Sequence, residues 1–151
     1  MVSANDIGLS GPPYWFPIEE GKVKEFARSI GATDSVYLDG ETPLALPTFL
    51  GIAGRFWGYT LDDPKESALA AVDLDRSLLL HAEEEYEYPN GLPRAGTVLT
   101  AQTRIKDVTE KTGKRGGKLT FVVTETEFKD QAGVIVAVSR QTIVKTETAP
   151  V

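Results

Sequence analysis

Apolar residues recur in four segments of the second half of the chain, and turn-forming residues bound each segment. Their many Val, Ile, Thr and aromatic residues are typical of β-strands. The predicted strands are Leu78–Tyr88, Thr97–Val108, Leu119–Phe128 and Val134–Val144. The basic stretch 111–118 and residues 129–133 predict hairpin loops, so we expect an antiparallel meander. The continuously apolar runs 121–123 and 134–138 indicate that both faces of this sheet are covered.

The first half of the chain predicts helices. Apolar residues follow helical spacing from about Ile18, at Val23, Phe26, Ala27 and Ile30. Glu19 and Glu20 suit the start of this helix, and Gly31 is placed for a left-handed C-cap. A short apolar segment, Ser35–Leu38, precedes a turn at Asp39–Gly40.

The segment Leu46–Gly58 carries Gly51, Ala53, Gly54 and Gly58, which disfavour an exposed helix but let other parts of the chain approach closely. It predicts a buried helix over Thr48–Trp57. A short surface helix is expected to begin at Asp63 and Pro64. A small-residue helix followed by a long antiparallel sheet is the order of the hot-dog fold, so the predicted class is α+β with the sheet wrapped around a central helix.

Composition and charge narrow the classes of protein to which the chain can belong. The 151 residues predict one domain, 1–151, with 41% hydrophobic and 25% charged residues, which is usual for a soluble protein. No apolar run is long enough for a membrane span, and the first ten residues do not form a signal peptide. We therefore expect a cytoplasmic protein without a membrane partner. A formal charge of -6 argues against binding nucleic acid.

The chain has no cysteine and a single histidine, His81. Cysteine nucleophiles, disulfides and zinc sites built on several histidines are therefore excluded. A Ser-His-Asp arrangement would depend on His81, which lies in a predicted strand. We expect no metal and no cofactor.

Four motifs, in this order, resemble the MaoC-like acyl dehydratases: 30–37 (Ile-Gly-Ala-Thr-Asp-Ser-Val-Tyr), 46–49 (Leu-Pro-Thr-Phe), 80–88 (Leu-His-Ala-Glu-Glu-Glu-Tyr-Glu-Tyr) and 94–96 (Arg-Ala-Gly). More narrowly, the chain is similar to the N-terminal half-domain of fungal-type fatty acid synthase dehydratases. The same half-domain forms the non-catalytic subunits of split (3R)-hydroxyacyl dehydratases. The resemblance covers nearly the whole chain.

Catalytic members of that family carry Asp-x-Asn-Pro-x-His, whose Asp and His handle the water that adds to or leaves the acyl chain. With Gly31 before the motif, Ala32 stands at the Asp position and Tyr37 at the His position. A register that starts at Asp34 ends on Asp39 and also lacks the imidazole. The resemblance therefore implies no catalytic residue here, and a chain that pairs with a catalytic hot-dog subunit, with itself, or with both. Its implied ligand is an acyl-CoA or acyl-carrier-protein thioester.

The candidate substrate-binding residues are Pro47, Thr48, Phe49, Phe56, Trp57 and His81. The aromatic residues are candidates for an acyl channel, although aromatics on a buried helix are more often core. His81 is a candidate for the thioester pocket, although a lone histidine at a strand start is more often structural. The basic loop 111–118 is a candidate for contact with coenzyme A phosphates or an acidic carrier, although a charged loop that is simply solvated is more common.

Besides a non-catalytic subunit of an acyl dehydratase, two other classes of function stay open. A hot-dog thioesterase commonly needs a carboxylate near the central helix, and Leu46–Gly58 contains none. A non-enzymatic acyl-thioester binder or assembly module is the third class.

Overall fold

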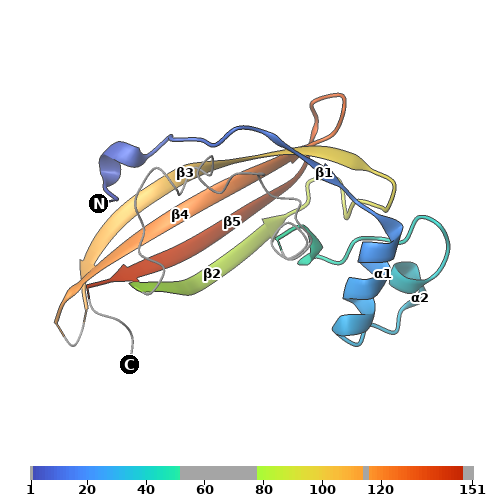
Figure 1. The fold of residues 1–151 in the computed structure, drawn as a ribbon, viewed down its shortest axis with the longest axis horizontal. Coiled ribbons are helices and arrows are strands. Elements are labelled where there is room, and N and C mark those ends of the chain that lie inside the picture. The colour runs from blue at the N-terminus through green and yellow to red at the C-terminus, as the bar shows by residue number, and fades with distance from the viewer. Residues whose placement is uncertain (1, 52–77, 114–115, 148–151) are drawn as a thin grey trace.

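Five strands form one antiparallel sheet in the computed structural model, which describes residues 2–51, 78–113 and 116–147. The sheet order is β1-β3-β4-β5-β2 (Figure 1). The strands are β1 (Tyr14–Pro17), β2 (Leu79–Glu87), β3 (Val98–Thr112), β4 (Lys118–Lys129) and β5 (Ile135–Thr146). The four strands predicted from the pattern are thereby confirmed, with shifts of a few residues at their ends.

The connectivity differs from a simple meander in one place. Strands β3, β4 and β5 are successive hairpin neighbours, but β2 pairs with β5 and not with β3. After β2 the chain leaves the sheet and pairs with residues near Leu44, through a bridge from Arg94 and a bond from the Ala45 N–H to the Pro93 carbonyl. This detour prevents a β2–β3 hairpin. The short strand β1 was not predicted, because its four residues follow a Pro-Pro pair, end on Pro17 and carry no long alternating pattern.

The helices of the first half agree with their sequence signals. Helix α1 (Glu20–Ser29) buries Val23, Phe26 and Ala27, and Gly31 takes a left-handed φ of 72° just beyond its end. Residues Ser35–Leu38 form a single turn, α2, whose N-cap Asp34 accepts the Val36 N–H at 3.0 Å. Both helices lie together near one end of the sheet (Figure 1). A turn of 3-10 helix, η1 (Ala4–Asp6), opens the chain.

The predicted central helix is described only at its start, where Phe49, Leu50 and Gly51 are helical. The rest of Thr48–Trp57 and the surface helix expected at Asp63 lie outside the described residues. No helix in the described ranges is long and apolar enough to cross a membrane.

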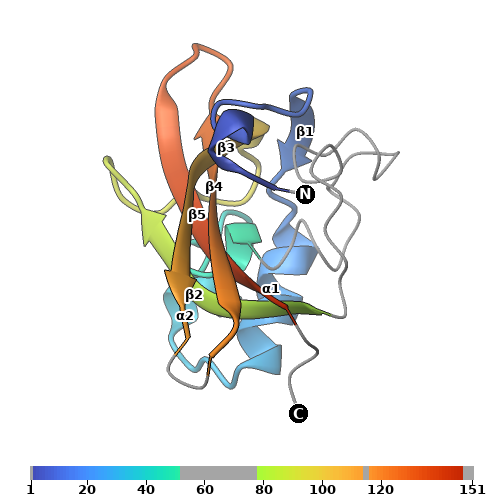
Figure 2. The same ribbon diagram turned by 90° about the vertical axis from the view of Figure 1, so that its left-hand side faces the viewer.

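The two faces of the sheet differ in chemistry. We call the face that bears Leu99, Ala101 and Phe128 the inner face. These residues share a buried cluster with α1 and with four residues before and at the start of the central helix: Ala45, Leu46, Phe49 and Leu50. A second apolar cluster follows farther along the same face, formed by Val2, Ile105, Val108, Val122 and Ile143. The opposite, outer face bears Arg104, Glu125 and Arg140. The sheet is twisted and curved, as Figure 2 shows.

Candidate functional site

The end of β2 holds the segment that leads into the central helix. Residues Glu84, Tyr86 and Tyr88 alternate along the chain, so they lie on one face, and Tyr86 pairs with Ser139 on the inner side of the sheet. The Tyr88 hydroxyl donates to the Pro47 carbonyl oxygen. Burial raises the pKa of Tyr88, so this phenol stays protonated and keeps donating at any ordinary pH.

A carboxylate and a phenol of β2 meet the first turn of the central helix. The Tyr86 hydroxyl donates to Glu84 Oε1 at 2.7 Å. A Cβ atom added at Gly51 would lie 2.0 Å from Tyr86 Oη and 2.6 Å from Glu84 Oε1. The missing side chain of Gly51 therefore lets this polar pair reach the helix backbone.

Sequence reasoning missed Glu84 and Tyr86, although a signal was present. Period-2 alternation in the acidic run Glu83–Glu87 puts Glu85 and Glu87 on the outer face of β2 and Glu84 on the inner face. The structure brings that one carboxylate to Gly51, which is more than thirty residues away in sequence.

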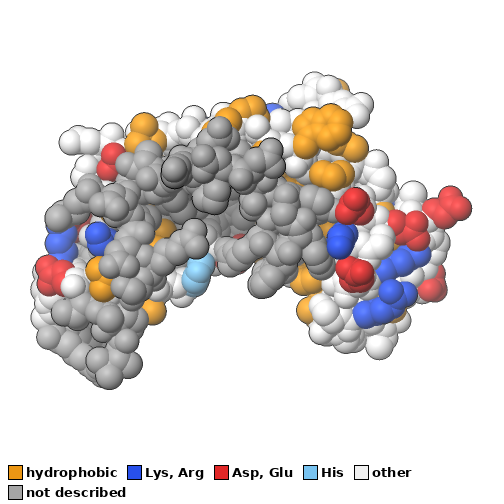
Figure 3. Space-filling view, in the orientation of Figure 1, with side chains coloured by type: hydrophobic (Ala, Val, Ile, Leu, Met, Phe, Trp, Pro, Cys, Tyr) orange, Lys and Arg blue, Asp and Glu red, His pale blue; other side chains and the backbone are white. Residues whose placement is uncertain are grey.

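The candidate binding residues fall into different environments. Pro47 and Thr48 are exposed next to the Tyr88 contact, whereas Phe49 is fully buried and meets Phe26 edge-on at a ring distance of 5.9 Å. His81 is exposed on β2; the single histidine appears pale blue at the surface in Figure 3. Phe56 and Trp57 lie outside the described residues. Substrate binding by these six residues stays a prediction.

The structure also places the residues that the two registers of the catalytic motif single out. Ala32 and Tyr37 are half-buried and pack against the main inner cluster. In the alternative register, the Asp34 carboxylate is engaged in capping α2, and Asp39 is exposed. The first register thus has a methyl group where the motif has its Asp, and the second has the Asp39 carboxylate where the motif has its His.

The outer face carries a charged network centred on Glu125, which is 2% exposed. Its carboxylate accepts hydrogen bonds from Arg104, Lys106 and Arg140. Burial acts to raise the pKa of Glu125, but these hydrogen bonds and the charge of Lys106 outweigh it and lower the pKa to about 2. The ionised form of Glu125 is therefore strongly favoured.

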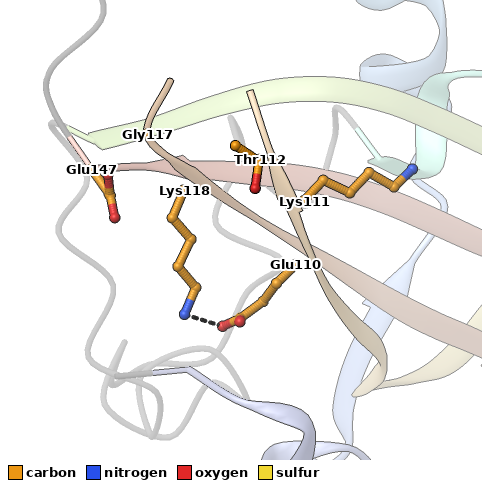
Figure 4. A pocket seen from close by; sticks show the side chains of 6 residues that line it. All are labelled: Glu110, Lys111, Thr112, Gly117, Lys118 and Glu147. Carbon is orange, nitrogen blue, oxygen red and sulfur yellow. Dashed lines mark ion pairs between the residues drawn. The ribbon is translucent and has the colours of Figure 1, made fainter. Parts of the chain in front are cut away.

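The described residues line an open cleft at each of two places. One, of about 460 Å³, lies at the β3–β4 hairpin and is lined by Glu110, Lys111, Thr112, Gly117, Lys118 and Glu147 (Figure 4). Lys118 points toward Glu110 and pairs with it at 2.5 Å, so part of the basic charge of this loop is neutralised. The other, of about 510 Å³, lies on the outer face beside Glu125. No group of three His, Cys, Asp or Glu side chains suited to a metal occurs in the described ranges.

The antiparallel sheet, with a helix starting on its inner face, defines a hot-dog protein, and solved structures confirm that class. One chain of the HadBC (3R-hydroxyacyl-ACP dehydratase) complex from Mycobacterium tuberculosis superposes with a TM-score of 0.66, covering 92% of this chain and 98% of that one at 17% identity. A chain of the ChsH1–ChsH2 complex from the same organism gives 0.73, with 94% and 86% coverage at 16% identity. At these identities the likeness shows the fold alone.

Sequence comparison identifies the family to which the chain belongs. Residues 5–139 match the family described as FAS1-like, dehydratase domain region, and the chain belongs to it. The resemblance to MaoC-like dehydratases is thereby confirmed. The enoyl-CoA hydratase ChsH3 of Mycobacterium tuberculosis is 28% identical over 144 residues, which are 91% of this chain and 47% of that protein. The chain thus spans about half the length of this relative.

Proposed function

We propose that this chain is the non-catalytic, substrate-pocket subunit of a heteromeric (R)-specific enoyl-thioester hydratase or 3-hydroxyacyl-thioester dehydratase. It is supported by the motif register predicted from the sequence, which puts Ala32 and Tyr37 at the acid–base positions, and by the packing of both residues against the inner cluster. Hydration places a proton on Cα and a hydroxyl on Cβ of the enoyl thioester, so it needs a base for the water and an acid for Cα. A catalytic hot-dog partner with an intact Asp-x-Asn-Pro-x-His motif supplies both.

The free edge of β2 is the surface we assign to that partner. Strand β2 pairs with β5 along one side, and no described strand pairs with its other side. Unpaired backbone groups of an edge strand invite pairing with another sheet. The same strand carries the Glu84–Tyr86 pair, and the exposed Pro47 and Thr48 lie near its end. A partner paired with this edge would therefore lie close to these residues, and an acyl-CoA or acyl-carrier-protein thioester would bind between the two chains. A second copy of this chain is the alternative occupant of the edge.

Co-expression with neighbouring reading frames tests the proposal. The chain is purified through a tag, and hydration of trans-2-enoyl-CoA is measured for the isolated chain and for whatever complex co-elutes. We expect activity only in the complex, and its loss when the partner's motif Asp is changed to Asn. Turnover by the isolated chain that survives repurification would refute a non-catalytic role.

A thioesterase is the second candidate, because the structure supplies the carboxylate that Leu46–Gly58 lacks. Glu84 lies against Gly51 at the start of the central helix, where it is placed to activate water. Water would attack the thioester carbonyl, the C–S bond would break, and a carboxylic acid and a free thiol would form. Release of coenzyme A from acyl-CoA by the isolated chain, abolished by Glu84→Gln, would favour this function. Acyl-CoA binding without turnover in either assay would favour a non-enzymatic binder.

A further inference from the structure

The Arg140 guanidinium joins three strands on the outer face. Its Nε donates to Glu125 Oε2 of β4 at 2.8 Å. Its Nη1 donates to Glu85 of β2 at 2.7 Å, and its Nη2 donates to Glu87 of β2 at 3.3 Å. A planar fork that meets carboxylates on both sides fixes direction as well as distance. Arg140 therefore connects the edge strand to the middle of the sheet.

Glu125 fixes the geometry of that connection. It is buried, and Arg104 and Lys106 of β3 hold its carboxylate from the other side. A carboxylate held by several charged donors has little freedom to turn, so the guanidinium that it binds is also held in place.

Strand β2 needs such support. It pairs along one side only, and its register with β5 shifts at a bulge between His81 and Glu83. A slip by one residue would exchange the two faces of the strand, turning Tyr86 outward and Glu85 inward. The Tyr86–Glu84 contact at Gly51 and the Tyr88 contact at Pro47 would both be lost.

We propose that Arg140 is a positioning residue, which holds the register of β2 from the outer face. The strand thereby presents Glu84 and Tyr86 to Gly51 and its free edge to a partner. Arg140 acts through the Glu85 and Glu87 carboxylates of β2, and the hydrogen bonds described for its guanidinium do not reach the inner-face site. The part that concerns the partner rests on the proposed function, whereas the register of β2 is a property of this chain alone.

Hydrogen exchange of the full chain tests the register. Arg140→Met keeps the length of the side chain and removes the fork. The matched control is Lys106→Met, which removes a cation from the same Glu125 carboxylate; in the described ranges Lys106 forms ion pairs with Glu125 and none with β2. We expect Arg140→Met to speed exchange of residues 79–87 about tenfold or more, with β3 and β4 changed much less. The control should leave β2 unchanged. Equal effects of the two variants on β2, or no effect of either, would overturn the proposal.

A second variant removes the contact between Arg140 and β2 by changing β2 instead of β5. Glu85→Gln combined with Glu87→Gln leaves the Arg140–Glu125 bond and should speed exchange of β2 in the same way as Arg140→Met but by a smaller factor, because both carboxylates are 55% exposed. Unchanged exchange in this variant would contradict the inference, because the fork would then have no function at β2.

Partner affinity separates positioning from general stability. In the complex, Arg140→Met should weaken association about tenfold, more than a core variant of equal melting temperature does. Equal weakening by the two would contradict the inference about the partner. If no partner is recovered, the proposed function fails while the exchange experiment still decides the register.

Discussion

The inner and outer faces of this sheet come from the same strands, yet they stabilise the protein by different means. On the inner face Phe16 is fully buried and meets Phe128 edge-on at a ring distance of 5.2 Å. On the outer face Glu125 is equally buried but depends on three cations. Apolar burial has no directional requirement, whereas a buried carboxylate is tolerated only when several donors satisfy it. The inner face therefore stabilises the fold as a whole through apolar burial, whereas the outer face fixes the register of the strands.

The largest effect on stability should follow from creating a cavity on the inner face. Phe16→Ala removes a fully buried ring and should lower the free energy of unfolding by about 3–5 kcal/mol. The matched control is its neighbour Trp15, which is 75% exposed. Trp15→Ala should change stability by no more than about 0.5 kcal/mol. Urea denaturation of both variants measures the difference; similar losses would show that the two faces are not distinct at β1.

The second effect concerns the outer face and depends on pH. The pKa of Glu125 is lowered from 4.5 to about 2 in the folded chain. A lowered folded pKa contributes stability above the unfolded pKa, and this contribution is lost as pH falls through the folded value. We expect a loss of roughly 3 kcal/mol from this group between about pH 5 and pH 2.

Glu125→Gln isolates that contribution. The variant should be less stable near neutral pH, by roughly 1–3 kcal/mol, because a neutral amide binds the three cations more weakly. Its stability should also fall less on acidification than that of the native chain. Parallel curves of stability against pH would show that Glu125 is not the group that titrates.

The third effect lies where β2 meets the central helix. Gly51→Ala puts a methyl group against Tyr86 Oη and Glu84 Oε1, two side-chain ends that must turn away, and should destabilise the chain by about 1 kcal/mol. Gly21→Ala is the matched control, because Gly21 lies in α1 with nothing within 4 Å of its added Cβ. The control should stabilise by about 0.5–1 kcal/mol. Thermal melts that rank the two variants the other way would exclude close contact at Gly51.

Much of the fold follows from local patterns. The long strands have enough alternating or continuous apolar residues to be located, and helix α1 has both its period and a glycine stop. The pairing of β2 with β5 could not be predicted, because it depends on the detour through Arg94 and Pro93 rather than on a turn signal.

The site was less accessible to sequence reasoning. Ala32 and Tyr37 were identified through the resemblance to a motif, not through their surroundings. The Glu84–Tyr86 contact joins residues distant in sequence, and nothing local in Gly51 distinguishes it from the other small residues of its segment. The outer network was missed for the same reason: its cations and carboxylates come from four strands, and only the register brings them together.

The smallest effect should appear at the β3–β4 hairpin, where an ion pair lies in the open. Lys118 pairs with Glu110 at 2.5 Å, and their side chains are 42% and 49% exposed. Exposed pairs contribute about 0–1 kcal/mol and are screened by salt, unlike a carboxylate buried under its donors. Lys118→Ala should therefore cost less than about 1 kcal/mol in dilute buffer and close to nothing at ~1 M salt. Glu125→Gln should keep most of its cost under the same conditions, because the buried carboxylate is shielded from mobile ions. Denaturation of both variants at the two salt concentrations makes the comparison, and a salt-resistant cost at Lys118 would mean that the hairpin cleft shields charge as the outer face does.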